Sequence, residues 1–386
     1  MLTNAIRINW RNYGFSVDRR TALKLPLLLA AGTAVATAGR AGAEPGRWPA
    51  ERANSWYQAQ GWLVGANYIT SNAVNQLEMF QPGTYDSRRI DGELAAARSL
   101  GFNTMRVFLH DQLWAQDRQG FQGRLAQFVA IAARHGIKPL FVLFDSCWDP
   151  FPRPGRQRPP RPGVHNSGWV QSPGAEHLGD RRYVSVLHDY VTGVVGQFRS
   201  DDRVLGWDLW NEPDNPARVY RKVERSDKLA LVADLLPQVF RWARAVDPAQ
   251  PLTSGVWQGN WADPGQRSTI SGIQLDNSDV ITFHSYAAPA DFEARIAELS
   301  PLGRPVVCTE YLARTRGSTV EEFCQLPSGT TLERSTGVWS PERPRRTCRG
   351  TRGITRTVRH RRCGSATCCG RTGGPIRTAN SKRFAS

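Results

Sequence analysis

The stretch Val204–Pro213, with the sequence VLGWDLWNEP, decides the fold. Its first half is apolar enough for a buried strand, and Pro213 stops that strand because proline cannot donate to a sheet ladder. Glu212 is therefore expected where a core strand meets a loop. Enzymes commonly place an acid at such a position, since loops at strand ends are held by a rigid scaffold.

Short apolar segments alternate with longer amphipathic ones on both sides of this stretch, from residue 61 onward. This alternation is typical of β/α units on a parallel sheet. The predicted strands are Trp62–Tyr68, Thr104–Leu109, Lys138–Phe144, Val204–Trp210, Leu252–Gly255, Val280–His284 and Pro305–Thr309. The predicted helices are Ile90–Leu100, Leu125–His135, Arg182–Phe198, Asp227–Val246 and Phe292–Leu299. This order predicts an α/β fold of the (β/α)₈ TIM-barrel type, which needs about 250 residues.

A second glutamate, Glu310, ends the seventh predicted strand in the sequence VVCTEY of Val306–Tyr311. In a closed barrel the ends of the fourth and seventh strands face each other across one mouth. Two carboxyl groups so placed can divide the cleavage of a glycosidic bond between them. One protonates the leaving oxygen, and the other, kept ionised, attacks the anomeric carbon. The alternative is a pair of unrelated surface glutamates at loop starts.

The Asn-Glu-Pro triplet at a strand end, together with the strand-seven glutamate, resembles the retaining glycoside hydrolases of the cellulase clan. Family 5 of the glycoside hydrolases is the nearest branch, and the resemblance covers roughly residues 61–323. It implies that Glu212 is the acid/base and Glu310 the nucleophile of a double displacement. The two carboxyl groups of such a site lie about 5–5.5 Å apart.

Four further residues match supporting positions of this clan. Arg106, a charge inside an apolar strand, resembles the arginine that holds the nucleophile ionised; the alternative is a core ion pair such as one with Asp208. Asn211 is placed to bond the sugar 2-hydroxyl, or else only forms a turn. His284 and Tyr286 resemble the pair that lines the site, where the tyrosine hydroxyl contacts the nucleophile. For His284, a satisfied core histidine is the alternative.

Other polar and aromatic residues near strand ends are candidate sugar contacts. Either hydroxyl binding or loop capping is expected of Asn67, Tyr68, His110 and Asp145. Tryptophans in the long loop 145–181 and after the fifth strand are candidate stacking platforms, although tryptophan is more often a core residue. These are Trp148, Trp169, Trp257 and Trp261.

The sequence contains no recognisable cofactor or metal motif. Its seven histidines are scattered without an H-E-x-x-H pattern, and no glycine-rich phosphate loop follows a strand. We therefore expect no cofactor and no metal site. Cys147 and Cys308 fall on distant strands of the predicted barrel, which argues against a disulfide between them.

Positive charge and cysteine gather at the carboxyl-terminal end of the chain. The net charge is +16, of which residues 324–386 carry +12, together with five of the seven cysteines. A strongly basic chain would suggest nucleic acid or an anionic membrane as a partner. The remaining residues are nearly neutral, which argues against such a partner for the barrel.

Residues 324–386 also lack the apolar pattern of an eighth strand and a last helix, so we predict a barrel that is incomplete at strand 8. Their Arg/Cys/Gly/Thr composition is typical of GC-rich DNA translated out of frame. A shift of two nucleotides within the codons of residues 333–345 can encode a strand that ends in tryptophan. We interpret the segment as a frameshifted, disordered tail after the loss of one nucleotide near Phe323. A genuine basic tail or a nucleic-acid-binding appendage is the alternative.

Residues 1–43 resemble a twin-arginine export signal. Arg19 and Arg20 precede an apolar run over residues 25–38, and Ala41-Gly42-Ala43 offers a small-residue cleavage site. The alternative is a membrane anchor, but the run is shorter than the ~20 residues of a membrane span. We expect a periplasmic or extracellular protein with its catalytic barrel in residues 44–323.

These features predict a secreted retaining β-glycoside hydrolase that cleaves a β-1,4-linked polysaccharide or oligosaccharide. The sequence does not distinguish mannan, glucan and xylan. We expect a monomer with no nucleic-acid partner and no membrane association after signal cleavage. The alternative is a catalytically decayed barrel that still binds carbohydrate. If strand eight is missing, the edges of its neighbours are unpaired, and poor folding with little turnover is expected.

Overall fold

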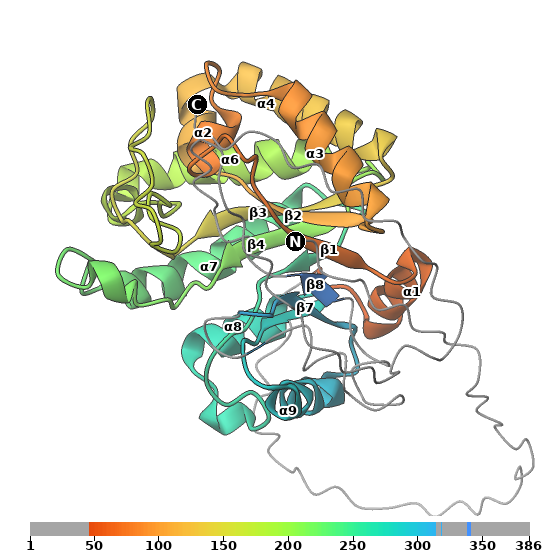
Figure 1. Cartoon of the computed structure of the whole chain (residues 1–386). Coiled ribbons are helices and arrows are strands. Elements are labelled where there is room, and N and C mark those ends of the chain that lie inside the picture. Colours follow the sequence, from red (N-terminus) through yellow and green to blue (C-terminus); the bar gives the residue numbers. More distant parts are fainter. Residues whose placement is uncertain (1–45, 314–317, 319–337, 341–386) are drawn as a thin grey trace, which may run out of the picture. The chain divides into compact units, whose positions relative to one another are not determined.

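The computed structural model describes residues 46–313, 318 and 338–340, in which strands and helices alternate (Figure 1). The strands are β1 Val64–Tyr68, β2 Thr104–Phe108, β3 Lys138–Asp145, β4 Gly206–Asn211, β5 Leu252–Thr253, β6 Ile281–His284, β7 Val306–Glu310 and β8 Val338–Ser340. The helices are α1 Ala50–Gln60, α2 Gln76–Phe80, α3 Ser87–Ser99, α4 Asp111–Arg134, α5 Ala175–Leu178, α6 Val184–Gln197, α7 Lys228–Ala245, α8 Thr269–Asn277 and α9 Pro289–Leu299. The predicted export signal, and all of the predicted tail except residues 338–340, lie outside the described residues.

The strands form one parallel sheet in the order β5-β4-β3-β2-β1-β8-β7-β6. The two end strands of this order, β5 and β6, are joined by an isolated parallel bridge between Val256 and Phe283. Sequential parallel strands with intervening helices are the arrangement of a (β/α)₈ barrel. The predicted fold class is therefore confirmed, with a weakly paired seam between β5 and β6.

Among the described residues, Val338–Ser340 occupies the eighth position of the barrel as β8. β8 pairs with β1 at three positions and with β7 at one, where Cys308 lies opposite Val338. The edges of β1 and β7 are thus paired here, although the sequence predicts unpaired edges. An extended backbone of any sequence can supply ladder hydrogen bonds, which composition alone does not reveal.

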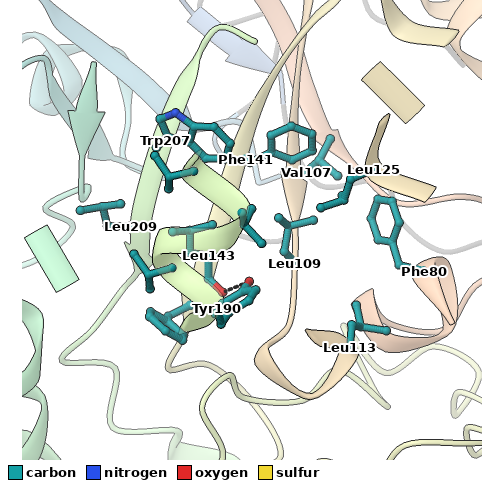
Figure 2. Packing of buried hydrophobic residues seen from close by; sticks show 14 of the residues in the cluster. Phe80, Val107, Leu109, Leu113, Leu125, Phe141, Leu143, Tyr190, Trp207 and Leu209 are labelled. Carbon is teal, nitrogen blue, oxygen red and sulfur yellow. Dashed lines mark hydrogen bonds between the residues drawn. The ribbon is translucent and has the colours of Figure 1, made fainter. Parts of the chain in front are cut away.

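A hydrophobic core lies between the sheet and the outer helices (Figure 2). Val107 and Leu109, two residues apart, both belong to it, as do Phe141 and Leu143. The Tyr190 hydroxyl on α6 donates to the Leu143 carbonyl at 2.9 Å, which satisfies the polar end of a buried ring. Because side chains alternate along a strand, the residues between these apolar ones face the barrel interior. The interior is where the polar site residues lie.

Local signals in the sequence explain several helix ends. α3 begins after Asp86, whose side chain accepts from the Arg89 N–H, and the chain leaves this helix at Gly101, with φ 91°. Gly136, with φ 63°, follows α4 in the same way.

None of the helices in the described ranges is both long and apolar enough to span a membrane. Cys147 and Cys308 are buried and free.

Helix α1 lies at the amino-terminal end of the strands. Its Trp56 and Tyr57 pack on a small apolar cluster at the strand starts. The members of that cluster are Leu63, Leu140, Leu205, Val280 and Val307. The strand starts thus enclose an apolar cluster, whereas the polar side chains of the site gather where the strands end.

Candidate active site

The ends of β4 and β7 place Glu212 and Glu310 beside each other. One carboxylate oxygen of each, and a ring nitrogen of His284, all lie within 4.8 Å of one another. Both glutamates are buried, with 7% of their surface exposed. Retaining glycosidases hold their carboxyl groups about 5–5.5 Å apart and inverting ones about 6.5–9.5 Å apart. The oxygen separation lies on the retaining side of this range.

Arg106, fully buried on β2, binds both strands that carry these glutamates. Its Nη1 donates to Glu310 Oε1 at 2.6 Å, and its Nε and Nη2 both donate to Asp208 Oδ2, at 3.0 and 2.6 Å. Nη2 also donates to Asn211 Oδ1 at 2.8 Å, and Nη1 to Asn67 Oδ1 at 3.3 Å. The ion pair with Asp208, which the sequence offers as an alternative, is present together with the contact to Glu310.

Glu310 is held as a carboxylate. Burial alone would raise its pKa, but the charges of His284 and Arg106 and hydrogen bonds from Tyr286 and Asn67 lower the pKa to about 2. The Tyr286 hydroxyl donates to Oε2, the oxygen that Arg106 leaves free. The predicted contact between this tyrosine and this glutamate is therefore present in the structure. An ionised carboxylate at neutral pH is what a nucleophile needs.

Glu212 has a different environment. Its Oε1 lies 2.9 Å from His284 Nδ1, while its Oε2 accepts from Asn215 Nδ2 at 2.6 Å and from Cys147 Sγ at 3.3 Å. Its backbone φ of 41° lies in the left-handed region. For a residue other than glycine this conformation costs on the order of 1–3 kcal/mol and is found mainly at functional sites. A turn follows at Pro213, closed by the Asn215 N–H on the Glu212 carbonyl at 2.9 Å.

His284 connects the two glutamates. Its Nδ1 lies 2.9 Å from Glu212 Oε1 and 3.7 Å from Glu310 Oε2. Burial would lower the pKa of His284, but the charge of Glu310 and the contact with Glu212 raise it above the usual value. A raised pKa favours the imidazolium, whose Nδ1–H can be donated to either carboxylate. His284 is therefore part of the polar site and not only a core residue.

Asn211 is fixed at both ends of its amide. Its Oδ1 accepts from Arg106, and its Nδ2 donates to Asp145 Oδ1 at 2.9 Å. Asp145 Oδ1 also accepts from the Cys147 N–H at 2.9 Å. Burial raises the pKa of Asp145 to about 7, although hydrogen bonds from Asn211 and Cys147 oppose the rise. Asp145 is thus a third carboxyl group at the site, and it orients Asn211.

Two residues that are predicted to contact the sugar, Tyr68 and His110, have structural contacts instead. Tyr68 belongs to the outer hydrophobic core, and its hydroxyl donates to Glu93 Oε2 at 3.0 Å. This prediction is wrong because neighbouring side chains on a strand point to opposite faces, and Asn67 is the one that reaches Arg106. His110 is fully buried and caps α4, with Nδ1 accepting from the Gln112 N–H at 3.1 Å. For His110, the capping alternative holds.

The four tryptophans divide into two groups. Trp261 is fully buried, and Trp169 packs edge-on against Phe108 with ring centroids 5.1 Å apart. Both are core residues, so the prediction of stacking platforms is wrong for them. Trp148 and Trp257 are only half-buried. These two remain the candidate platforms.

Three residues around the acid were missed by the sequence reasoning: Cys147, Asn215 and Lys228. Lys228 Nζ donates to the carbonyls of Ser146 at 2.7 Å and Asn215 at 3.0 Å, and pairs with Glu224 at 2.9 Å. The asparagine two residues after a proline is a turn signal, and a lysine in an apolar helix face must be paired if buried. Nothing in the sequence around the cysteine indicates its contact.

The pair of glutamates and His284 are close enough to share a metal ion. The donors around Glu310 argue against that use. Arg106 donates to Oε1 and Tyr286 to Oε2, so both oxygens already accept hydrogen bonds and one faces a positive charge. This surrounding suits a free carboxylate better than a metal ligand.

Comparison with known proteins gives a partial match in sequence. No family model matches the chain. A protein named probable mannan endo-1,4-beta-mannosidase F from Aspergillus flavus is 30% identical over 99 residues, which are 25% of this chain and 18% of that protein. The protein of the same name from Aspergillus oryzae matches with the same values. The chain therefore aligns with less than a fifth of the length of these relatives.

Comparison with solved structures gives a match in fold. The exo-beta-1,4-mannosidase Op5Man5 from Opitutaceae bacterium strain TAV5 has a TM-score of 0.50 and 17% identity, over 72% of this chain and 51% of that one. At this identity the match shows the fold alone, an α/β barrel. The aligned segment and the fold together confirm the predicted resemblance of this chain to family 5-like glycoside hydrolases of the cellulase clan.

Proposed function

We propose that the chain is a retaining β-glycoside hydrolase whose substrate is a β-1,4-linked mannan or manno-oligosaccharide. The pair Glu212 and Glu310 carries the proposal, with oxygens within 4.8 Å of each other in opposite surroundings. The charges around Glu310 keep it ionised, whereas Glu212 shares a short contact with an ionisable histidine. Mannan is chosen because the relatives and the solved structure are named as mannan- or mannoside-cleaving enzymes.

The proposed reaction has two displacements. In the first, a Glu310 oxygen attacks the anomeric carbon while the bond to the leaving oxygen breaks and Glu212 gives that oxygen its proton. In the second, Glu212 takes a proton from water, whose oxygen attacks the same carbon and releases Glu310. Arg106 and Tyr286 orient the nucleophile through both of its oxygens.

Trapping of the covalent intermediate tests this proposal. A 2-deoxy-2-fluoro mannoside with a good leaving group slows the second displacement, so a retaining enzyme accumulates a glycosyl ester. We expect one sugar per chain, attached to Glu310 in peptide mass spectra, and no label on the Glu310→Gln variant. A label on another residue, or turnover of the parent chain with inversion at the anomeric carbon, would contradict the assignment.

A substrate panel tests the class of glycan. We expect hydrolysis of β-mannan and manno-oligosaccharides to exceed that of β-glucan and xylan. The Glu212→Gln variant should lose on the order of 10²-fold or more in kcat/KM on oligosaccharides, because general acid assistance is removed. Binding of oligosaccharide without any turnover would instead support the decayed, carbohydrate-binding barrel.

Export is a separate part of the proposal, supported by the paired arginines and the apolar run in residues 1–43. To test export, residues 1–43 are fused to a reporter protein. The reporter is one that becomes active only when it folds in the cytoplasm and is then exported. Replacement of Arg19 and Arg20 by lysine should abolish export by a twin-arginine route. Export that is unaffected by this change would contradict it.

A further inference from the structure

Cys147 and Asn215 both donate to one oxygen of Glu212 and leave its other oxygen to His284. We infer that Cys147 and Asn215 are positioning residues that reserve Oε2 of Glu212 as an acceptor, so that Oε1 carries the transferable proton. This inference rests on the proposed function, in which Glu212 is the acid/base. It assigns a role to two side chains that the motif of the resembled family does not include.

The orientation of the Asn215 amide is determined by its neighbour. Its Oδ1 accepts from the Ala217 N–H at 2.8 Å, so Nδ2 is the atom that faces Glu212 Oε2 at 2.6 Å. A carboxylate oxygen has two lone-pair sites, and the Asn215 N–H and the Cys147 S–H occupy both. A proton on Oε2 would point at two other donors. Among the described contacts Oε1 has one partner, His284 Nδ1 at 2.9 Å, and so keeps one lone-pair site. We place the transferable proton of Glu212 at that remaining site of Oε1.

The thiol of Cys147 remains a donor. Burial, together with the charges of Asp145, Glu212 and Glu310, raises its pKa well above the usual value. The sulfur accordingly keeps its proton at neutral pH and donates it toward Oε2 at 3.3 Å. A thiol is a weak donor, so it fills the second acceptor site of Oε2 with less stabilisation of the ionised acid than an amide would give.

A single buried ammonium group holds both donors in place. Lys228 Nζ donates to the carbonyl of Ser146, the residue before Cys147, and to the carbonyl of Asn215 itself. The turns after β3 and β4 are therefore tied to one point, and neither donor can swing away alone. The acid is thus oriented by neighbouring turns and not only by its own strand.

Leaving-group dependence separates this role from a structural one. Cleavage of a 2,4-dinitrophenyl mannoside needs almost no acid assistance, whereas cleavage of mannobiose depends on it. For Asn215→Ala we expect kcat/KM on mannobiose to fall about tenfold or more, and kcat/KM on the dinitrophenyl substrate to stay within about threefold of the parent. Because ionised Glu212 loses a donor, the alkaline limb of the mannobiose pH profile should move to higher pH.

Two variants of Cys147 should shift the alkaline limb of the mannobiose pH profile in opposite directions. Cys147→Ser replaces a weak donor by a stronger one, so the alkaline limb should move to lower pH. Cys147→Ala should behave as a milder form of Asn215→Ala. Asn54→Ala is the matched control, since Asn54 lies on α1 and bonds only the carbonyls of Ala50 and Gly303 among the described contacts.

The outcomes distinguish failure of the proposed function from failure of the positioning role of Asn215 and Cys147. If the parent chain hydrolyses neither substrate, the proposed function fails. Suppose that the parent chain is active while Asn215→Ala lowers kcat/KM equally on mannobiose and on the dinitrophenyl mannoside. If the alkaline limb also stays in place, the positioning role is overturned. An Asn215→Ala profile no different from that of Asn54→Ala would overturn it as well.

Discussion

At the scale of single residues, the surroundings of the two glutamates divide the chemistry. Glu310 accepts from the guanidinium of Arg106 and the phenol of Tyr286, and both contacts lower its pKa. Glu212 accepts from an amide and a thiol and faces an imidazole. Two identical side chains therefore have different hydrogen-bond partners, and only Glu310 is paired with a guanidinium.

Removing the phenol tests the first of these surroundings. In Tyr286→Phe, Glu310 loses one of the hydrogen bonds that lower its pKa, so the acid limb of kcat/KM should move to higher pH. We also expect kcat/KM at neutral pH to fall on the order of 10²-fold, because the nucleophile is less well oriented. Tyr85→Phe, which removes a hydroxyl that bonds the Arg124 carbonyl, is the control and should leave the acid limb unchanged.

Asp145 gives a prediction about stability and pH. Its pKa of about 7 lies above the usual value of an aspartate, so ionisation destabilises the fold. The penalty is absent below about pH 4, grows up to about pH 7 and is then constant. Glu310 acts oppositely in a lower window: its contribution is present above about pH 4.5 and is lost as the pH falls toward its pKa of about 2.

Thermal unfolding of Asp145→Asn across pH 4 to 8 checks this sign. An asparagine keeps the Oδ1 that accepts from Asn211 and from the Cys147 N–H, but it cannot ionise. The Tm of the variant, relative to the parent, should therefore rise between about pH 4 and about pH 7. If the Tm of parent and variant changes with pH in parallel over this range, Asp145 does not titrate in the folded chain.

At the scale of elements, α7 supports the turns that carry the site. Its first residue, Lys228, forms a buried ion pair with Glu224, with side-chain exposures of 7% and 8%. Removing one partner of a buried pair costs about 3–5 kcal/mol because the other charge is left without compensation. Lys228→Met should lower the free energy of unfolding by about this amount.

Two further variants control for this effect in denaturant unfolding. Lys228→Met combined with Glu224→Gln removes both charges and should recover part of the loss. Arg134→Met breaks an exposed pair with Asp91 and should change the free energy of unfolding by less than about 1 kcal/mol. Equal losses for the buried and the exposed pair would contradict the proposed support of the turns by Lys228.

Elements with a regular apolar pattern could be predicted from the sequence. Seven strands lie within a few residues of their predicted bounds, because parallel core strands are continuous apolar runs. α8 was not predicted, since its buried face includes the polar residues Ser271, Gln274 and Asn277. The first half of α4 was also missed, where a non-helical φ of −158° at Asp117 interrupts the helix.

The same distinction holds in the site. Arg106, Glu212, His284 and Glu310 could be found because each is a polar residue at the inner face or the end of an apolar strand. The contacts of Cys147 and Asn215 could not be found, since they depend on how the turns after β3 and β4 approach each other. Such an approach is set by tertiary packing and leaves no periodic pattern in the sequence.

At the scale of the whole molecule, the uneven distribution of charge leads to a test of the carboxyl-terminal segment. Residues 324–386 carry most of the net charge, and within them only Val338–Ser340 is described, as β8. If the segment is a frameshift, restoring the frame near Phe323 should give a longer eighth strand. We expect the restored chain to have a higher Tm and a higher kcat/KM than the chain as given. Equal values for both chains would contradict the frameshift hypothesis.

The left-handed backbone at Glu212 sets the stability of the fold against the proposed reaction. Glycine or asparagine would adopt that conformation at lower energetic cost. Neither side chain could supply the proton that the proposed reaction needs. Residue 212 is therefore a position at which stability and the proposed turnover make opposite demands on the side chain.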